Sequence, residues 1–173
     1  MPAEGQAERH ALVDGVFAEI ELPGEGDDWR AEVRRRCLST RTVLARHPWA
    51  LALVETRTSP GPATLRHHDA MLGVLRAGGF SLPMTAHAYA IIDAYVFAFV
   101  LQEASLPFDG ADSANAVTDS IMEGFAAGDY PHLVEFTTQH VQQPGYHVGG
   151  QFEFGLDLIL DALTVHVDNA RPS

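Results

Sequence analysis

The residues of this sequence that could do chemistry are histidines, arginines and a few carboxylates set among apolar residues at helical spacing. The sequence has nine histidines, and His67, His68 and Asp69 form the densest group of potential metal ligands. Adjacent residues of a helix point about 100° apart, so these three cannot hold one ion unless the helix bends. On a helical wheel His68 falls with Met71 on the apolar face. This favours a hydrogen-bonded core or pocket histidine, and we expect no metal site.

Arg36 and Asp93 are charged residues on otherwise apolar helical faces. A buried arginine needs a partner, and Asp93 could be that partner, which would make both residues structural. The alternative is that Arg36 binds an acidic or polar group of a ligand. The helix that contains Asp93 also carries the aromatic residues Tyr89, Tyr95, Phe97 and Phe99. Such side chains are more typical of a core than of a stacking site, although a ligand pocket would give the same pattern.

Motifs of common enzyme classes are absent from the sequence. It has no His-Glu-x-x-His, no Gly-x-Ser-x-Gly, no Walker loop and no Glu-x-x-His pair for a di-iron centre. Gly24-Glu25-Gly26 begins like a dinucleotide fingerprint but lacks the third glycine. We therefore expect no catalytic residue and no cofactor. An all-helical enzyme built on Arg36, His68 and Asp93 is the least favoured alternative.

The charge balance excludes some partners. The 173 residues carry 23 acids and 11 bases, a formal net charge of −12, and every base is an arginine. Such a surface repels phosphate, so we expect no direct binding of nucleic acid.

The single Cys37 excludes an internal disulfide, and no secretory signal opens the chain, which indicates the cytoplasm. Residues 83–101 are the most membrane-like, but they contain His87 and Asp93, and we interpret them as a buried helix of a soluble protein.

Helical periodicity runs through most of the chain, and glycine and proline clusters mark the gaps. We predict an all-α fold, a single domain of seven or eight helices. The predicted helices cover residues 7–20, 29–46, 48–57, 63–77, 81–105, 115–127, 131–141 and 149–168. Residues 1–9 would be a loose N-terminus, 10–168 the domain and 169–173 a tail.

The last predicted helix, residues 149–168, is apolar over about twice the width that a surface helix needs. Its main apolar stripe consists of Phe152, Leu156, Ile159, Leu160, Leu163 and Val167. A helix of this kind is either central within one chain or covered partly by the same helix of a twin subunit. Periodicity alone favours neither alternative. The second makes the stripe a dimerisation surface and the protein a homodimer.

Several segments, in this order and spacing, resemble the TetR family of transcriptional repressors. They are ALVDGVFAEIELP from residue 11, Trp29 at a helix start, LARHPWALALVETRTSPGP from residue 44, LRAGGFS from residue 75 and FEFGLDLILDAL from residue 152. The similarity is to the C-terminal, effector-binding region of the tetracycline repressor class, and it covers about residues 10–168. It implies a small-molecule pocket among the middle helices and a four-helix-bundle dimer formed by the helices 81–105 and 149–168 of two subunits.

The resemblance also implies a missing part. Members of the family begin with a basic three-helix head that contains a DNA-binding helix-turn-helix, whereas this sequence starts near the junction with that head. We therefore expect a chain that does not bind an operator by itself. It would be either the sensing part of a repressor or a free-standing module that forms heterodimers with a full-length regulator.

The resemblance further suggests where a ligand would bind. The places of the family's pocket residues are held by Arg36, Thr40, Met71 and Gln102, and Thr56-Arg57 matches a Thr-Arg pair. No histidine stands where the family's magnesium ligand is expected, so we expect a largely apolar effector without metal, with one anionic or carbonyl group for Arg36 or Arg57. With the residues chosen above, the predicted ligand-binding set is Arg36, Thr40, Thr56, Arg57, His68, Met71, Tyr95 and Gln102.

Overall fold

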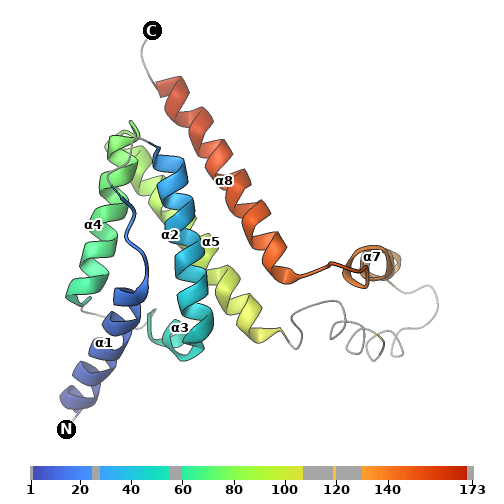
Figure 1. Cartoon of the computed structure of the whole chain (residues 1–173), viewed down its shortest axis with the longest axis horizontal. Coiled ribbons are helices and arrows are strands. Elements are labelled where there is room, and N and C mark those ends of the chain that lie inside the picture. The colour runs from blue at the N-terminus through green and yellow to red at the C-terminus, as the bar shows by residue number, and fades with distance from the viewer. Residues whose placement is uncertain (1, 25–27, 55–59, 107–118, 120–129, 171–173) are drawn as a thin grey trace. The chain divides into compact units, whose positions relative to one another are not determined.

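The regular elements of the computed structural model are all helical in the residues that it describes, which are 2–24, 28–54, 60–106, 119 and 130–170 (Figure 1). The elements are α1 (Pro2–Glu19), α2 (Trp29–Arg46), α3 (Pro48–Val54), α4 (Pro62–Ala77), α5 (Leu82–Ser105), α7 (Pro131–Phe136), the π-helical segment η1 (Thr137–Val141) and α8 (Val148–Ala170). The predicted all-α fold is confirmed. The helix predicted over 115–127 falls outside the described residues, apart from residue 119.

The chain falls into two compact units by its internal contacts. Unit 1 consists of Met1–Ala104 and Leu156–Ser173, and unit 2 consists of Ser105–Gly155. Helices α1 to α5 therefore belong to unit 1, apart from the last residue of α5. Helices α7 and η1 belong to unit 2, and α8 begins in unit 2 and continues into unit 1.

Local chemistry explains where two of the helices begin. The Asp28 carboxylate accepts a hydrogen bond of 3.1 Å from the Ala31 amide and so caps α2. Helix α4 starts with Pro62 at its first position and is capped by Asp14, which belongs to α1. Asp14 accepts from the Ala63 and Thr64 amides at 3.0 and 2.9 Å. One carboxylate therefore satisfies the first turn of α4 and also fastens α1 to it.

The hydrophobic core of unit 1 forms where α1 meets the other helices. All five helices α1 to α5 contribute to one cluster of buried side chains. Its members are Val13, Val16, Phe17, Ile20, Val43, Leu44, Ala50, Leu51, Ala63 and Val100. Burial of aliphatic and aromatic side chains supplies most of the stabilising free energy of such a domain. This core holds α2, α4 and α5 in place, and these three helices carry the polar residues described below.

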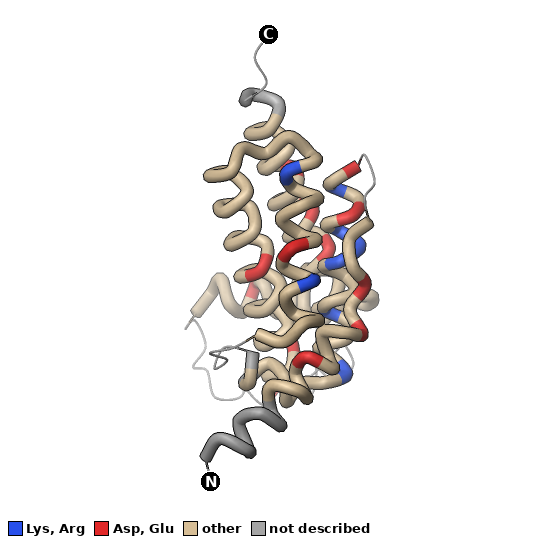
Figure 2. Tube along the Cα trace, turned by 90° about the vertical axis from the view of Figure 1, so that its left-hand side faces the viewer, with Lys and Arg blue, Asp and Glu red and all other residues tan. Residues whose placement is uncertain are grey.

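All six arginines of α2 form ion pairs with acidic residues of the same chain. Each of them forms an ion pair with an acidic side chain, and Figure 2 shows basic and acidic positions close together. Arg30 and Arg34 reach Asp161 and Asp157 of α8 at 2.6 and 2.9 Å. These pairs are partly exposed, so each contributes little stability, but together they fix which side of α8 faces α2.

Helix α5 differs from the prediction. Its buried residues are Thr85, Ala88, Ile92, Val96 and Val100, which form one face. On another face Ile91 and Leu101 are 49% and 58% exposed, so the expectation that the helix is buried is wrong for that face. The helix is long and apolar enough to cross a membrane by length and composition, with 28% of its apolar window buried, and a single helix of this kind is weak evidence for a membrane. Part of the apolar surface of α5 is therefore left uncovered by the core of this chain.

Candidate functional site

A chain of polar side chains runs through the interior of unit 1, and we call it the interior polar cluster. It consists of Arg36 of α2, His68 of α4 and Tyr89 and Asp93 of α5. Arg36 Nη1 donates a hydrogen bond of 2.8 Å to Asp93 Oδ1. The Tyr89 hydroxyl is hydrogen-bonded to His68 Nδ1.

Burial and mutual charge set the protonation states in the cluster. The Arg36 side chain is 1% exposed and that of Asp93 is 17% exposed. Burial is the largest influence and opposes the charge of Arg36, but Asp93 together with Cys37 and Tyr89 outweighs it, and the pKa of the guanidinium is raised. Burial and the charge of Asp93 also raise the pKa of Tyr89, which therefore stays a neutral hydroxyl. The cluster thus contains a cation, an anion and neutral hydrogen-bonding groups.

His67 is a buried residue of α4, although the sequence analysis placed His68 on the apolar face of this helix. Its side chain is on the buried face of α4, with the residue 3% exposed, and its ring packs edge-on against Phe17 at a centroid distance of 6.0 Å. Burial and the charge of Arg36 lower the pKa of His67, so the ring is neutral at pH 7. The signal was available, because Thr64, His67, Met71 and Val74 recur at spacings of three and four residues and all are buried.

The buried cysteine next to Arg36 takes no part in chemistry. Cys37 is 0% exposed, and burial raises the pKa of its thiol to about 11. A thiol with this pKa holds almost no thiolate at neutral pH and is a poor nucleophile. Cys37 therefore acts as a small apolar side chain beside the interior polar cluster.

The structure brings some of the predicted ligand-binding residues together. Arg36 and His68 belong to the interior polar cluster, and the pairing of Arg36 with Asp93, one of the two alternatives, is confirmed. Thr40 lies one turn after Arg36 on α2, and its hydroxyl donates to the Arg36 carbonyl at 2.8 Å. Met71 is fully buried on the same face of α4 as His67. These residues occupy neighbouring helices of unit 1.

Other members of the predicted set lie elsewhere. Gln102 is exposed and lies nine residues after Asp93, about two and a half helical turns, which places it on the opposite side of α5. Tyr95 is half-buried and lies beside Phe99, at a centroid distance of 5.9 Å. Neither is among the contacts of the interior polar cluster described above. Thr56 and Arg57 fall outside the described residues.

The predicted dimerisation stripe on α8 lies inside the chain. Phe152, Leu156, Leu160, Leu163 and Val167 are buried, and Ile159 is half-buried. The side chains that remain open are Phe154, Leu158 and Val165, at 66%, 55% and 58% exposure. The physical reason is the pairing of Asp157 and Asp161 with arginines of α2, which turns the predicted stripe inward. A second subunit therefore has the opposite side of α8 available.

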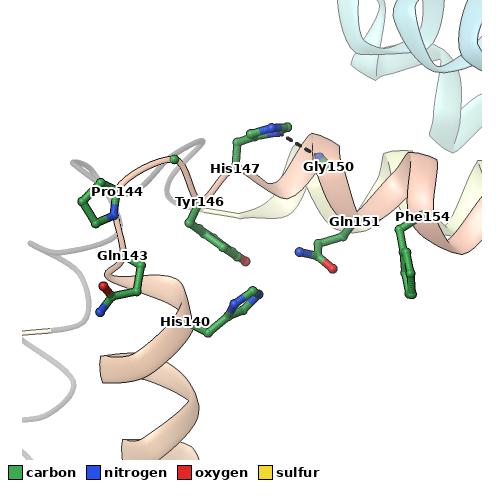
Figure 3. Close-up of a pocket in the computed structure, with 9 residues that line it drawn as sticks. His140, Gln143, Pro144, Tyr146, His147, Gly150, Gln151 and Phe154 are labelled. Atoms are coloured by element: carbon green, nitrogen blue, oxygen red, sulfur yellow. Dashed lines mark hydrogen bonds between the residues drawn. The ribbon is translucent and has the colours of Figure 1, made fainter.

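A concave feature lies within unit 2. The residues that line it are His140, Gln143, Pro144, Gly145, Tyr146, His147, Gly150, Gln151 and Phe154, around a volume of about 490 Å³ (Figure 3). His140 and Tyr146 pack edge-on at 5.3 Å, and the Gly150 amide donates to His147 Nδ1 at 2.8 Å. In the described part of the chain no three His, Cys, Asp or Glu side chains are grouped to hold a metal. Most of the lining side chains are solvent-exposed, so this hollow has the character of a surface groove.

The all-helical fold of this chain is also seen in solved structures of TetR-family regulators. A possible TetR-family transcriptional regulator from Streptomyces coelicolor A3(2) is 29% identical with a TM-score of 0.67, over 92% of this chain and 76% of that one. The Streptomyces coelicolor TetR-family protein ActR, in complex with actinorhodin, has the same fold, with a TM-score of 0.72 at 22% identity over 92% of this chain and 75% of that chain.

The family follows from the sequence comparison. Residues 22–167 match the tetracyclin repressor-like C-terminal domain, and the chain belongs to this family. It is similar to an HTH-type transcriptional regulator of Saccharopolyspora erythraea, 34% identical over 70% of this chain and 51% of that protein. It is also similar to the HTH-type transcriptional repressor DrrR1 of Streptomyces coeruleorubidus, 26% identical over 99% of this chain and 65% of that protein. The chain thus spans about half to two thirds of the length of these relatives.

Proposed function

We propose that this chain is the small-molecule-sensing and dimerisation domain of a TetR-family transcriptional repressor that acts in the cytoplasm. Membership of the C-terminal domain family supports the proposal, as do relatives that are named transcriptional regulator and repressor. The observation that carries it is the match of residues 22–167 to the tetracyclin repressor-like C-terminal domain. The role is regulatory and not enzymatic.

The interior polar cluster suits ligand recognition because its polar groups are few and linked to one another, with Arg36 buried and His68, Tyr89 and Asp93 half-buried. Ligand sites in proteins are mostly apolar, with a small number of polar groups that set the orientation of the ligand. Arg36, Thr40, His68 and Met71 are the ligand contacts that we propose from the described residues. Tyr95, Gln102, Thr56 and Arg57 stay predictions from the resemblance. The actinorhodin complex of ActR supports a small organic effector for a domain of this fold.

The proposed mechanism is a shift between packings of the helices. A ligand that binds one packing more tightly than another changes their populations, and the difference in affinity is the free energy available for regulation. Arg36, His68 and Tyr89 lie on three different helices, so a ligand that contacts them is sensitive to how α2, α4 and α5 pack. A DNA-binding part coupled to these helices would lose or gain affinity for its operator accordingly.

Dimerisation is the second part of the proposal. Ile91, Ala94, Ala98 and Leu101 form an exposed apolar stripe along α5, and Phe154, Leu158 and Val165 form another along α8. Exposed apolar stripes of this length are typical of protein contacts. A second copy of the chain, related by a two-fold axis, would cover both. We therefore propose the exposed side of α8 as the dimer contact surface, in place of the buried stripe that the sequence analysis named.

A thermal-shift screen tests the sensing function. The full chain is heated with a library of neutral and anionic aromatic compounds, and a compound that binds the folded state raises the melting temperature. Each compound found is tested again on Tyr89→Phe, which removes one hydroxyl of the cluster, and on Arg66→Ala, which changes an exposed residue of α4. The proposal expects the shift to shrink in Tyr89→Phe and to persist in Arg66→Ala. A library without any binder, or binders indifferent to Tyr89, would contradict it.

A further inference from the structure

The surface groove of unit 2 is a concave feature that shares no residue with the interior polar cluster. All the residues that line it fall within residues 140–154, so the groove belongs to unit 2 alone. Its volume is about 490 Å³. Small-molecule sites in proteins have volumes of about 300–1,000 Å³. The groove therefore has the size of a site for a small organic molecule.

A π-helical segment and a glycine turn form the backbone of the groove. Helix α7 continues into η1 (Thr137–Val141), and π-helical turns are rare and frequently lie at functional sites. After η1 the chain turns at Gly145, whose φ of 86° is a left-handed value that favours glycine. Val141 before the turn and Val148 after it are buried. The lining side chains therefore project from a turn that is anchored on both sides.

Three polar side chains point into the groove from different parts of this segment. Figure 3 shows the His140 imidazole, the Tyr146 hydroxyl and the Gln151 amide directed towards the same space. The rings of His140 and Tyr146 meet edge to face at a centroid distance of 5.3 Å. The Phe154 ring lies beside Gln151 at the other end of the lining (Figure 3). The groove thus combines aromatic side chains with an imidazole, a phenol and an amide.

The chemistry of the lining indicates an uncharged aromatic ligand. Among the described residues, the lining includes neither a carboxylate nor a guanidinium, so a charge placed there would lose hydration without gaining a counter-charge. Aromatic side chains pack favourably against other rings, either edge-on or offset. The imidazole, phenol and amide groups both donate and accept hydrogen bonds, so they match a hydroxyl, a carbonyl or an amide of a ligand.

We propose that the groove of unit 2 binds a small uncharged aromatic compound that carries a hydroxyl, carbonyl or amide group. The ring of the compound packs on Tyr146 and Phe154, and its polar group is held by His140 and Gln151. This site is additional to the effector contacts proposed in unit 1 and does not depend on them. Because Phe154 also lies on the side of α8 proposed for the dimer contact, the variants that test the groove are placed at His140 and Tyr146.

Three probes of similar size test the class of ligand. The uncharged aromatic alcohol is β-naphthol, its saturated counterpart is decahydro-β-naphthol, and β-naphthoate carries an anionic group. Each is titrated into the full chain, and the amide NMR signals of Gly145 and Gly150 report binding in the groove. The proposal expects β-naphthol to shift both signals and to bind about twofold to tenfold more tightly than the saturated alcohol, because ring contacts contribute this much. The anionic probe should bind more weakly than β-naphthol.

His140→Ala and Tyr146→Ala test the place of binding. Each removes a side chain that points into the groove, so each should weaken the binding of β-naphthol about threefold to tenfold. The matched control is His132→Ala, which removes an exposed histidine of α7 outside the lining and should leave the affinity unchanged. The melting temperature of each variant without ligand shows whether the chain is still folded.

The outcomes separate this inference from the proposed function. Unchanged Gly145 and Gly150 signals, binding of β-naphthoate as tight as that of β-naphthol, or unchanged affinity in the folded variants overturn the groove site. Shifts that appear only in α2, α4 and α5 overturn it as well, although they favour the sensing function. Compounds whose binding is indifferent to Tyr89→Phe and is lost in Tyr146→Ala support the groove and contradict the sensing site.

Discussion

Arg36 and Asp93, 57 residues apart in the sequence, are joined by a hydrogen-bonded ion pair of 2.8 Å inside unit 1. The pair ties α2 to α5, and one turn earlier on α5 Tyr89 is hydrogen-bonded to His68 of α4. Breaking such a pair leaves a buried charge without compensation, whereas replacing both partners by apolar groups does not. This asymmetry makes the role of the pair measurable.

Asp93→Ala should lower the free energy of unfolding by about 3–5 kcal/mol, because the guanidinium of Arg36 stays buried without its counter-ion. Urea denaturation at a fixed protein concentration measures the change. The double variant Arg36→Met with Asp93→Leu should recover most of the loss. A single variant as stable as the wild type would show that the pair is open to water in solution.

Asp14→Ala should lower the free energy of unfolding by about 1–2 kcal/mol, because α4 loses the cap on its first turn. Asp14 also accepts from the Thr64 hydroxyl at 3.0 Å, so the loss includes a contact between α1 and α4. Urea denaturation provides the value. Asp69→Ala, which removes an exposed carboxylate of the same helix, is the control and should change stability by less than about 0.5 kcal/mol.

The free energy of unfolding should fall as the pH is lowered through 6.5, and His67 should account for part of the fall. Burial lowers the pKa of His67 in the folded chain below its ordinary value of 6.5. The unfolded chain then takes up the proton first, so the contribution is fully present above pH 6.5 and is lost as the pH falls towards the lowered pKa. Urea denaturation from pH 7.5 to 5.5 should show a shallower loss for His67→Gln. Parallel curves for the two proteins would argue against a buried neutral ring.

Leu158→Glu and Ile91→Glu should convert a dimer into a monomer, because each places a charge in the proposed contact surface of α8 or α5. Light scattering after size exclusion gives the mass directly. Leu72→Glu is the matched control, since Leu72 is 41% exposed on α4, outside that surface. A wild-type chain that remains monomeric at high concentration would remove the basis for the dimer.

Cys37 should be inert towards thiol reagents in the folded chain. The residue is 0% exposed, and burial raises the pKa of its thiol to about 11, so access and thiolate content are both low. Absorbance with an aromatic disulfide reagent at pH 8 should show no reaction within minutes, and full reaction after unfolding in urea. Rapid labelling of the native protein would mean that α2 opens readily.

The fold could be predicted from the sequence to a large extent because helical periodicity, caps and breakers are local features. The helix predicted over 29–46 has the bounds of α2, and Pro48, Gly78 and Gly79 mark ends where the structure has them. The sequence analysis placed His68 on the apolar face of the helix 63–77, and this was wrong, because the buried histidine is His67. The structure gives the buried place to His67, since α1 lies against that side of the helix.

The sequence by itself determined the helical class, the excess of apolar surface on the helices 81–105 and 149–168, and the presence of a charged pair among apolar residues. The tertiary structure alone decided which partner Arg36 takes, which histidine is buried and which side of α8 remains open. The reason is physical: a helical wheel gives the relative directions of side chains, whereas the absolute rotation of a helix depends on contacts from distant segments. Here the arginines of α2 fix that rotation for α8 through Asp157 and Asp161.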